Sequence, residues 1–167
     1  MRVLGIDPGT ATTGYGVVEE TEEGLRALAY GVVTTPADWP LPKRLQTIYE
    51  ELRRLVQKWQ PDAAAVEEIF FNVNVRTAMS VGQARGVALL AMADEGMTVA
   101  EYGPGEVKQA LTGYGGAEKR QMQEMVRMLL GLSTPPYPDD AADALAVAIC
   151  HLHSARMRAL TSESSNG

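Results

Sequence analysis

Four carboxylates are the side chains of this sequence best suited to chemistry. Asp7 and Glu67 each end a short apolar run, while Asp140 and Asp143 lie three residues apart, on one face of a predicted helix. Carboxylates brought together repel one another, and a hard divalent cation such as Mg²⁺, which prefers oxygen ligands, relieves that repulsion. Two such ions about 3.5–4 Å apart can clamp the attacking and leaving oxygens of a phosphodiester. The four residues therefore predict a metal-dependent site that cleaves phosphodiesters.

Each carboxylate also has an ordinary structural explanation. Asp7 could cap the turn that follows it by accepting hydrogen bonds from the amides of Gly9 and Thr10. Acidic residues at the start of a helix complement its dipole, which accounts well for Asp139 or Asp140. It accounts less well for Asp143, which sits among small apolar residues typical of a helix packed on a sheet. No Ser/His or Cys/His arrangement in the sequence offers a comparable alternative for catalysis.

The elements predicted around these residues would bring the first two carboxylates together. A strand, helix, strand crossover joins parallel strands, so the strand that ends at Glu67 should run parallel to a neighbour. If that neighbour is the first strand, Asp7 and Glu67 emerge at one carboxyl edge of the sheet, where open α/β sheets place their sites. Because side chains alternate along a strand, only one of Glu67 and Glu68 should meet Asp7.

The whole chain reads as alternating strands and helices with no internal repeat. We expect an α/β fold with a five-stranded mixed sheet, in the order 3-2-1-4-5, and helices on both faces. Apolar spacing, glycines and prolines predict strands at 3–7, 14–20, 25–34, 63–68 and 97–102, and helices at 45–59, 75–94, 105–112, 117–130 and from 139.

Length and composition limit the class of protein. The 167 residues, 46% of them hydrophobic, fit one globular domain, predicted over 1–158, with a disordered polar tail over 159–167. The longest uncharged apolar stretch is too short to span a bilayer, and the N-terminus starts a strand instead of a signal peptide. A single cysteine, Cys150, and two histidines argue against disulfides and zinc. We therefore expect a cytoplasmic protein with no membrane contact.

The net charge of −6 is unusual for a protein that binds nucleic acid, because such domains usually carry a basic balance. Cations bound to the acidic groups, and lysines and arginines gathered on one face, would offset it.

Six motifs, spread in order from Arg2 to about His153, closely resemble the RuvC family of Holliday-junction resolvases. Any one of them is weak, but together they are specific. They are Gly5-Ile6-Asp7-Pro8-Gly9-Thr10 with Gly14-Tyr15-Gly16, Val66-Glu67-Glu68-Ile69-Phe70, Gly82-Gln83-Ala84-Arg85-Gly86, Val107-Lys108-Gln109, Ala117-Glu118-Lys119 and Asp140-Ala141-Ala142-Asp143-Ala144-Leu145-Ala146.

The resemblance implies a ribonuclease H-like fold and a homodimer that cuts two opposed strands of a four-way DNA junction, in recombination and repair. It also implies two Mg²⁺ ions per site, with Mn²⁺ as a substitute, ligatable 5′-phosphate nicks and a branch-migration motor as partner. The family's acidic positions match Asp7, Glu67, Asp140 and Asp143, and some members carry a histidine in place of Asp140.

The resemblance further implies three DNA contacts, and the start of the long helix adds a fourth candidate. Phe70 matches an aromatic residue that stacks on a junction base, worth roughly 1–3 kcal/mol, although core packing is the ordinary explanation for a Phe-Phe pair and suits Phe71 better. Lys108 and Lys119 match basic positions near the scissile phosphate, although Lys119 could equally belong to a solvated helix face. Arg76 is a further candidate for a phosphate contact.

The long helix could also form the dimer. Val75, Met79, Gly82, Gly86 and Leu90 follow one another along it and would expose a stripe to a second copy. A twofold dimer presents two sites to two symmetric strands, as a four-way junction requires. Burial of the stripe against the sheet is the alternative.

Three other classes of protein share parts of this pattern. Sugar kinases and actin-like ATPases also open with Gly-Ile-Asp-x-Gly-Thr, but 167 residues leave no room for their two-domain cleft. A ribonuclease H that cuts RNA–DNA hybrids would share the four carboxylates, and a hybrid-cleavage assay separates it from a junction nuclease. A non-catalytic DNA-binding module would have no need of four carboxylates on one edge.

Overall fold

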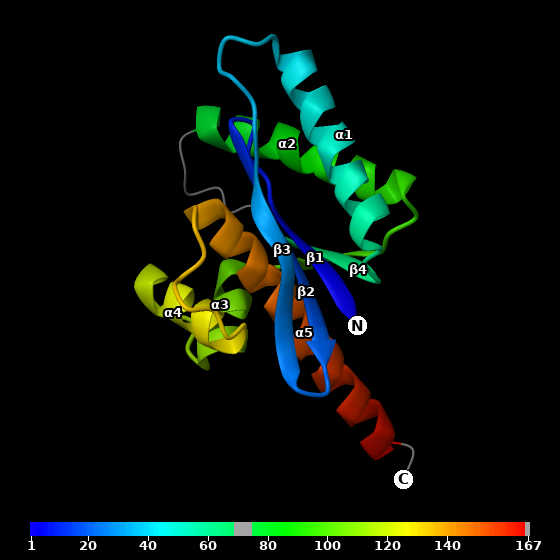
Figure 1. Ribbon diagram of the computed structural model, residues 1–167, viewed down its shortest axis with the longest axis vertical. Coiled ribbons are helices and arrows are strands. Elements are labelled where there is room, and N and C mark those ends of the chain that lie inside the picture. Colours follow the sequence, from blue (N-terminus) through cyan, green and yellow to red (C-terminus); the bar gives the residue numbers. More distant parts are fainter. Residues whose placement is uncertain (69–74, 166–167) are drawn as a thin grey trace.

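The computed structural model describes residues 1–68 and 75–165, and its centre is a five-stranded sheet with helices on both faces (Figure 1). The strand order β3-β2-β1-β4-β5 confirms the predicted order. The strands are β1 Arg2–Asp7, β2 Thr12–Thr21, β3 Gly24–Thr34, β4 Ala63–Glu67 and β5 Val99–Tyr102.

The directions of the strands confirm the crossover. β1 pairs antiparallel with β2, and β2 with β3, whereas β4 lies parallel to both β1 and β5. In the parallel pair Ile6 lies opposite Val66, so the next residue of each strand, Asp7 and Glu67, reaches the same edge of the sheet.

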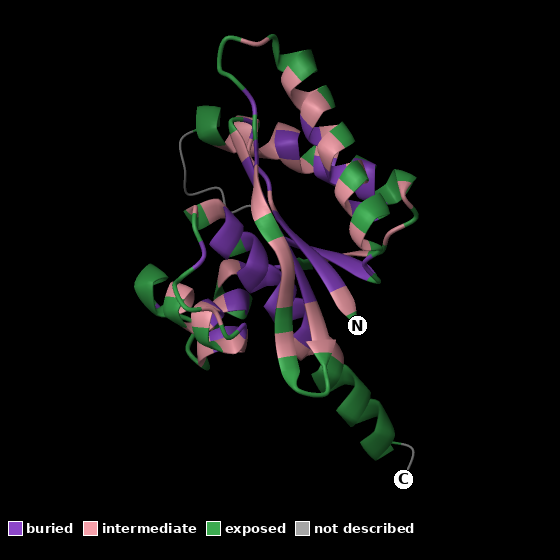
Figure 2. Cartoon of the chain, in the orientation of Figure 1, coloured by how far each residue is buried: buried purple, intermediate pink, exposed green. Residues whose placement is uncertain are grey.

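Alternate residues of the strands fill two separate cores. Leu4 and Ile6 of β1 pack under the helices α1, Leu41–Trp59, and α2, Val75–Asp94. Val3 packs on the other face with α3, Pro104–Thr112, α4, Lys119–Leu129, and α5, Asp139–Ser165. The first half of α5 is the most deeply buried helical segment (Figure 2). Its side chains are mostly alanine, with a few larger apolar residues.

Two glycines let α5 lie directly on the sheet. A Cβ atom at Gly14 would lie only 2.0 Å from the carbonyl oxygen of Asp140, and one at Gly5 only 1.9 Å from that of Ala144. Since no side chain fits in either place, the backbone of α5 touches β1 and β2 where a larger residue would hold it away. Gly14 is also the residue paired with Asp7 in the sheet, so this contact sets Asp140 beside Asp7.

The end of α5 differs from the prediction. The sequence predicted a disordered tail from residue 159, but the helix continues to Ser165 with its last residues exposed (Figures 1 and 2). No proline or glycine interrupts it, and its hydroxyl groups donate back to the helix, as Thr161 Oγ1 does to the carbonyl of Met157 at 2.9 Å. Within the described residues, no helix combines the length and apolar character needed to cross a membrane.

Candidate active site

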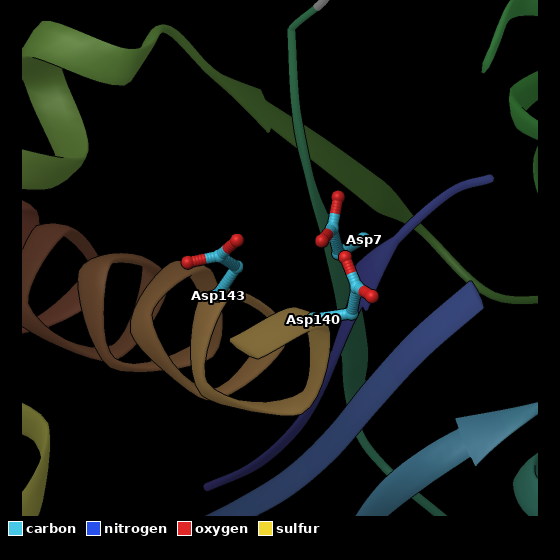
Figure 3. A group of neighbouring side chains, drawn as sticks. All are labelled: Asp7, Asp140 and Asp143. Carbon is cyan, nitrogen blue, oxygen red and sulfur yellow. The ribbon is translucent and has the colours of Figure 1, made fainter. Parts of the chain in front are cut away.

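Three of the four predicted carboxylates form one compact group. Asp7 ends β1, and Asp140 and Asp143 come from the first turns of α5 (Figure 3). One carboxylate oxygen from each lies within 4.8 Å of the others. Asp7 and Asp140 are half-buried, whereas Asp143 is exposed. This set of oxygen donors suits a hard divalent cation.

Burial and mutual repulsion disfavour the charged forms of these carboxylates. Burial, followed by the charge of Asp143 and a hydrogen bond with Asp140, raises the pKa of Asp7 to about 8. Desolvation also raises the pKa of Asp143, and the nearby charge of Lys119 partly opposes this effect. The Asp7 carboxylate is therefore protonated more easily than an ordinary aspartate, and a bound cation would favour its charged form.

Glu67 stands at the margin of this group. Desolvation and the charge of Asp143 raise its pKa, and the charge of Lys108 opposes them. The charge of Glu67 in turn raises the pKa of Asp7, so Glu67 is the residue of the pair that faces the site. Glu68 is exposed.

Thr13 supports the turn after β1. The amide of Gly9 donates to Thr13 Oγ1 at 3.3 Å, and the Thr13 hydroxyl donates back to the carbonyl of Gly9 at 2.6 Å. Thr13 thus takes the Gly9 amide, one of the two that the ordinary explanation assigned to Asp7, while the Asp7 carboxylate lies beside the first turns of α5 (Figure 3).

Two lysines approach the carboxylates from neighbouring helices. The charge of Lys108, on α3, works to lower the pKa of Glu67. The charge of Lys119, the first residue of α4, works in the same way to lower the pKa of Asp143. The Lys119 Nζ atom lies 2.7 Å from Asp139 Oδ2, and Gln123 Nε2 donates to Asp139 Oδ1 at 3.0 Å. Asp139 therefore holds Lys119 beside the site, a role that sequence reasoning missed because its position at a helix start signalled only a dipole effect.

Arg85 is a second residue that the sequence did not single out. It lies in α2, and its Nη1 donates to the backbone carbonyl of Glu67 at 2.9 Å while Nη2 pairs with Glu101. The Arg85 side chain is largely buried. It therefore ties α2 to the end of the strand that delivers Glu67. The only signal for it was its place in the motif Gly82–Gly86.

Two predicted DNA contacts remain, Arg76 and Phe70. Arg76 is exposed in the first turn of α2, whereas Phe70 falls outside the described residues, as does Phe71. Along the same helix, Val75, Met79 and Leu90 are 77%, 61% and 55% exposed. This stripe is open on the single chain, and burial against the sheet does not account for it.

Similarity to known proteins extends over almost the whole chain. A family model described as "Crossover junction endodeoxyribonuclease RuvC" matches residues 3–151. The crossover junction endodeoxyribonuclease RuvC of Chloroflexus aggregans is 63% identical over 155 residues, which cover 93% of this chain and 94% of that protein. The RuvC of Syntrophomonas wolfei is 57% identical over 157 residues, covering 94% of this chain and 91% of that protein.

Solved structures show the same fold. RuvC of Thermus thermophilus is 41% identical and superposes with a TM-score of 0.89, over 94% of this chain and 96% of that one. The structure of that protein in complex with a Holliday junction substrate gives 42% identity, the same TM-score and the same coverage. A yeast mitochondrial Holliday junction resolvase, 15% identical, matches with a TM-score of 0.64 over 90% of this chain and 78% of that one. The expected ribonuclease H-like fold is thereby confirmed.

Proposed function

The chain belongs to the RuvC family of crossover junction endodeoxyribonucleases, and from this premise we propose how its acidic site resolves four-way DNA junctions. Asp7, Glu67, Asp140 and Asp143 are the catalytic, metal-binding residues. The single observation that carries this assignment is the convergence of Asp7, Asp140 and Asp143 within 4.8 Å, on elements that the sequence places far apart.

The residues of the site fit Mg²⁺. All the donors are carboxylate oxygens, and burial together with the neighbouring carboxylates raises the pKa of Asp7, so a cation there would relieve an unfavourable charge. We assign two Mg²⁺ ions per site, with Mn²⁺ able to substitute. When bound, these ions supply an activated water molecule and stabilise the oxygen that leaves the phosphodiester.

The surrounding residues hold and orient the DNA strand. Lys108 and Lys119 contact the backbone phosphates beside the cut, and Asp139 keeps Lys119 in place for this contact. Arg76 contacts a more distant phosphate. Phe70, three residues after Glu67 in the sequence, stacks on a junction base near the crossover.

The active unit is a homodimer that joins through the stripe on α2. The exposure of Val75, Met79 and Leu90 supports this, because apolar side chains so open to water usually mark an interface. A twofold axis sets two acidic sites on two strands of the same polarity, so the nicks are paired and symmetric. At each nick water adds to the phosphorus and the P–O3′ bond breaks, which leaves a 3′-hydroxyl and a ligatable 5′-phosphate. A branch-migration motor is the further partner that supplies the junction.

Cleavage of a labelled four-way junction tests the proposal, beside plain duplex and an RNA–DNA hybrid, with Mg²⁺ or EDTA. We expect paired nicks on the junction alone, lost in EDTA and reduced roughly 100-fold or more by Asp7→Asn. Cleavage confined to the hybrid would make the protein a ribonuclease. Tight junction binding without nicks in Mg²⁺ and Mn²⁺ would show that the carboxylates have another role.

A further inference from the structure

The first half of α2 is not held in place by core packing. None of the residues 75–83 is buried, and the buried residues of the helix begin at Ala84. The exposed stripe assigned above to the dimer starts in this same half, with Val75 and Met79. The placement of this segment therefore depends on polar contacts with the rest of the chain and, in the proposed dimer, on the second copy.

A buried threonine supplies one such polar contact. Thr10 lies in the turn between β1 and β2 and is only 4% exposed. Its hydroxyl donates to the backbone carbonyl of Ser80 at 2.8 Å. Ser80 directly follows Met79 along α2, so the hydrogen bond joins the turn to the helix segment that carries the stripe (Figure 1).

Other hydrogen bonds make the turn a rigid unit. The Thr35 hydroxyl donates to the carbonyl of Thr10 at 2.6 Å, and the Thr35 amide donates to the carbonyl of Ala11 at 3.0 Å. Thr35 Oγ1 in turn accepts from Arg44 Nε at 2.9 Å. Because these bonds fix the turn on one side, a displacement of α2 that pulls on Thr10 is carried back along the chain to Asp7, three residues earlier.

Such a displacement would change the geometry of the acidic group. Asp140 and Asp143 belong to α5, which packs on the opposite face of the sheet from α2. A movement of the turn therefore shifts Asp7 relative to these two carboxylates. Mg²⁺ requires nearly ideal octahedral geometry with oxygens at about 2.0–2.1 Å, so a small shift of one carboxylate weakens its binding.

We propose that Thr10 is a positioning residue that couples the dimer helix to the metal site. Pairing of two copies through α2 fixes Ser80, and the Thr10 hydroxyl passes this placement to the turn that follows Asp7. Each site thus binds its cations best when the chain has a partner, which restricts the metal-loaded state to the form that has two sites. The inference rests on the proposed function, since it takes α2 as the interface and Asp7 as a ligand.

The test measures cation binding in the full-length protein without DNA. Mn²⁺ is the probe, because electron paramagnetic resonance reports the free ion directly. Four proteins form a double-mutant cycle: the unmodified chain, Met79→Asp, Thr10→Val and the double variant. We expect each single variant to bind Mn²⁺ about 5- to 20-fold more weakly, within the usual range of coupling between sites. The double variant should lose no more than about twofold beyond the weaker single variant, because both changes break the same connection.

Three further variants separate coupling from simple damage. Thr10→Ser keeps the hydroxyl and should bind Mn²⁺ within about twofold of the unmodified chain. Thr47→Val removes a hydroxyl that donates to a helix carbonyl at 2.9 Å within α1, and Met128→Asp adds a carboxylate to α4 at an exposed position. Both should bind Mn²⁺ normally. Light scattering should show that Thr10→Val remains a dimer, and Thr10→Ala replaces it if valine prevents folding.

The inference alone is overturned if Met79→Asp is a monomer that binds Mn²⁺ as tightly as the dimer, or if Thr10→Val binds normally. It is also overturned if the two losses multiply in the double variant, which would make Thr10 a merely structural residue. These results leave the acidic site and the dimer standing. A dimeric Met79→Asp protein, or an unmodified chain that binds no Mn²⁺, would instead remove the corresponding part of the proposed function and this inference with it.

Discussion

Asp7 shows how one residue can serve the site at the expense of the fold. Its pKa lies at about 8, against 3.8 for an ordinary aspartate, because burial and the neighbouring carboxylates disfavour its charge. Between these two values the folded protein keeps a proton that the unfolded chain releases, so the unfolding free energy falls as pH rises through this window. An uncharged residue at this position would avoid this loss of unfolding free energy.

Replacement of Asp7 by asparagine should therefore stabilise the cation-free protein. We expect Asp7→Asn to raise the unfolding temperature in EDTA by about 2–8 °C, which is roughly 1–2 kcal/mol for a domain of this size, and to do so more at about pH 8 than at about pH 5. Scanning calorimetry at both pH values measures this. Asp38→Asn, at an exposed carboxylate outside the site, is the control and should change little. An equal effect at both pH values would contradict the assigned pKa shift.

At the scale of elements, the site depends on how closely α5 approaches the sheet. Gly14 is the point of contact, because a Cβ atom there would overlap the carbonyl of Asp140. Gly14 belongs to one of the sequence motifs, but only the structure explains why a glycine is needed there. The residue that it contacts, Asp140, lies far away in the chain.

A methyl group at Gly14 should therefore damage the site more than the fold. We expect Gly14→Ala to cost about 1–3 kcal/mol through overpacking and to weaken cation binding and cleavage by at least about tenfold, since Asp140 and Asp7 are pushed apart. Gly105→Ala is the control, because a Cβ there meets nothing within 4 Å. Urea unfolding and calorimetric Mg²⁺ titration separate the two effects. Unchanged Mg²⁺ affinity in Gly14→Ala would show that the close approach does not set the geometry.

Arg85 connects another pair of elements, α2 and the end of β4. Arg85→Met loses the bond to the Glu67 carbonyl and the ion pair with Glu101, and we expect a loss of about 1–3 kcal/mol in stability and of roughly 10- to 100-fold in cleavage rate. Glu101→Gln keeps the bond to Glu67 and should retain most of the activity. If both variants lose activity equally in a single-turnover junction assay, the hydrogen bond from Arg85 to the Glu67 carbonyl does not determine the cleavage rate.

At the scale of the whole molecule, the strand order and the arrival of Asp7 and Glu67 at one edge of the sheet were predictable from the sequence. Strand periodicity and the handedness of crossovers leave few arrangements, and the family motifs narrowed them further. The contacts of Lys119 with Asp139 and of Arg85 with Glu67 were not predictable, because they join elements whose relative placement no local pattern encodes. The helical end of α5 was missed because polar composition was taken to mean disorder, although serine, threonine and glutamate continue a helix when nothing interrupts it.

The dimer is the prediction that belongs to the molecule as a whole. Met79 on α2 and Met128 on α4 are 61% and 59% exposed, so replacing either by aspartate adds the same charge to an equally open place. We expect Met79→Asp to give a monomer by light scattering and to abolish paired nicking, and Met128→Asp to remain a dimer that cuts in pairs. A dimeric Met79→Asp protein would place the interface elsewhere.

The position of α5 in the chain has a consequence for protein synthesis. Asp7 and Glu67 leave the ribosome early, but Asp140 and Asp143 arrive only with the last helix, which also fills the core on one face of the sheet. A chain that stops before α5 lacks two of the four proposed ligands and the helix that fills one core. We therefore expect nascent and prematurely terminated chains to be unable to cut DNA, so that this ability is gained together with the native structure.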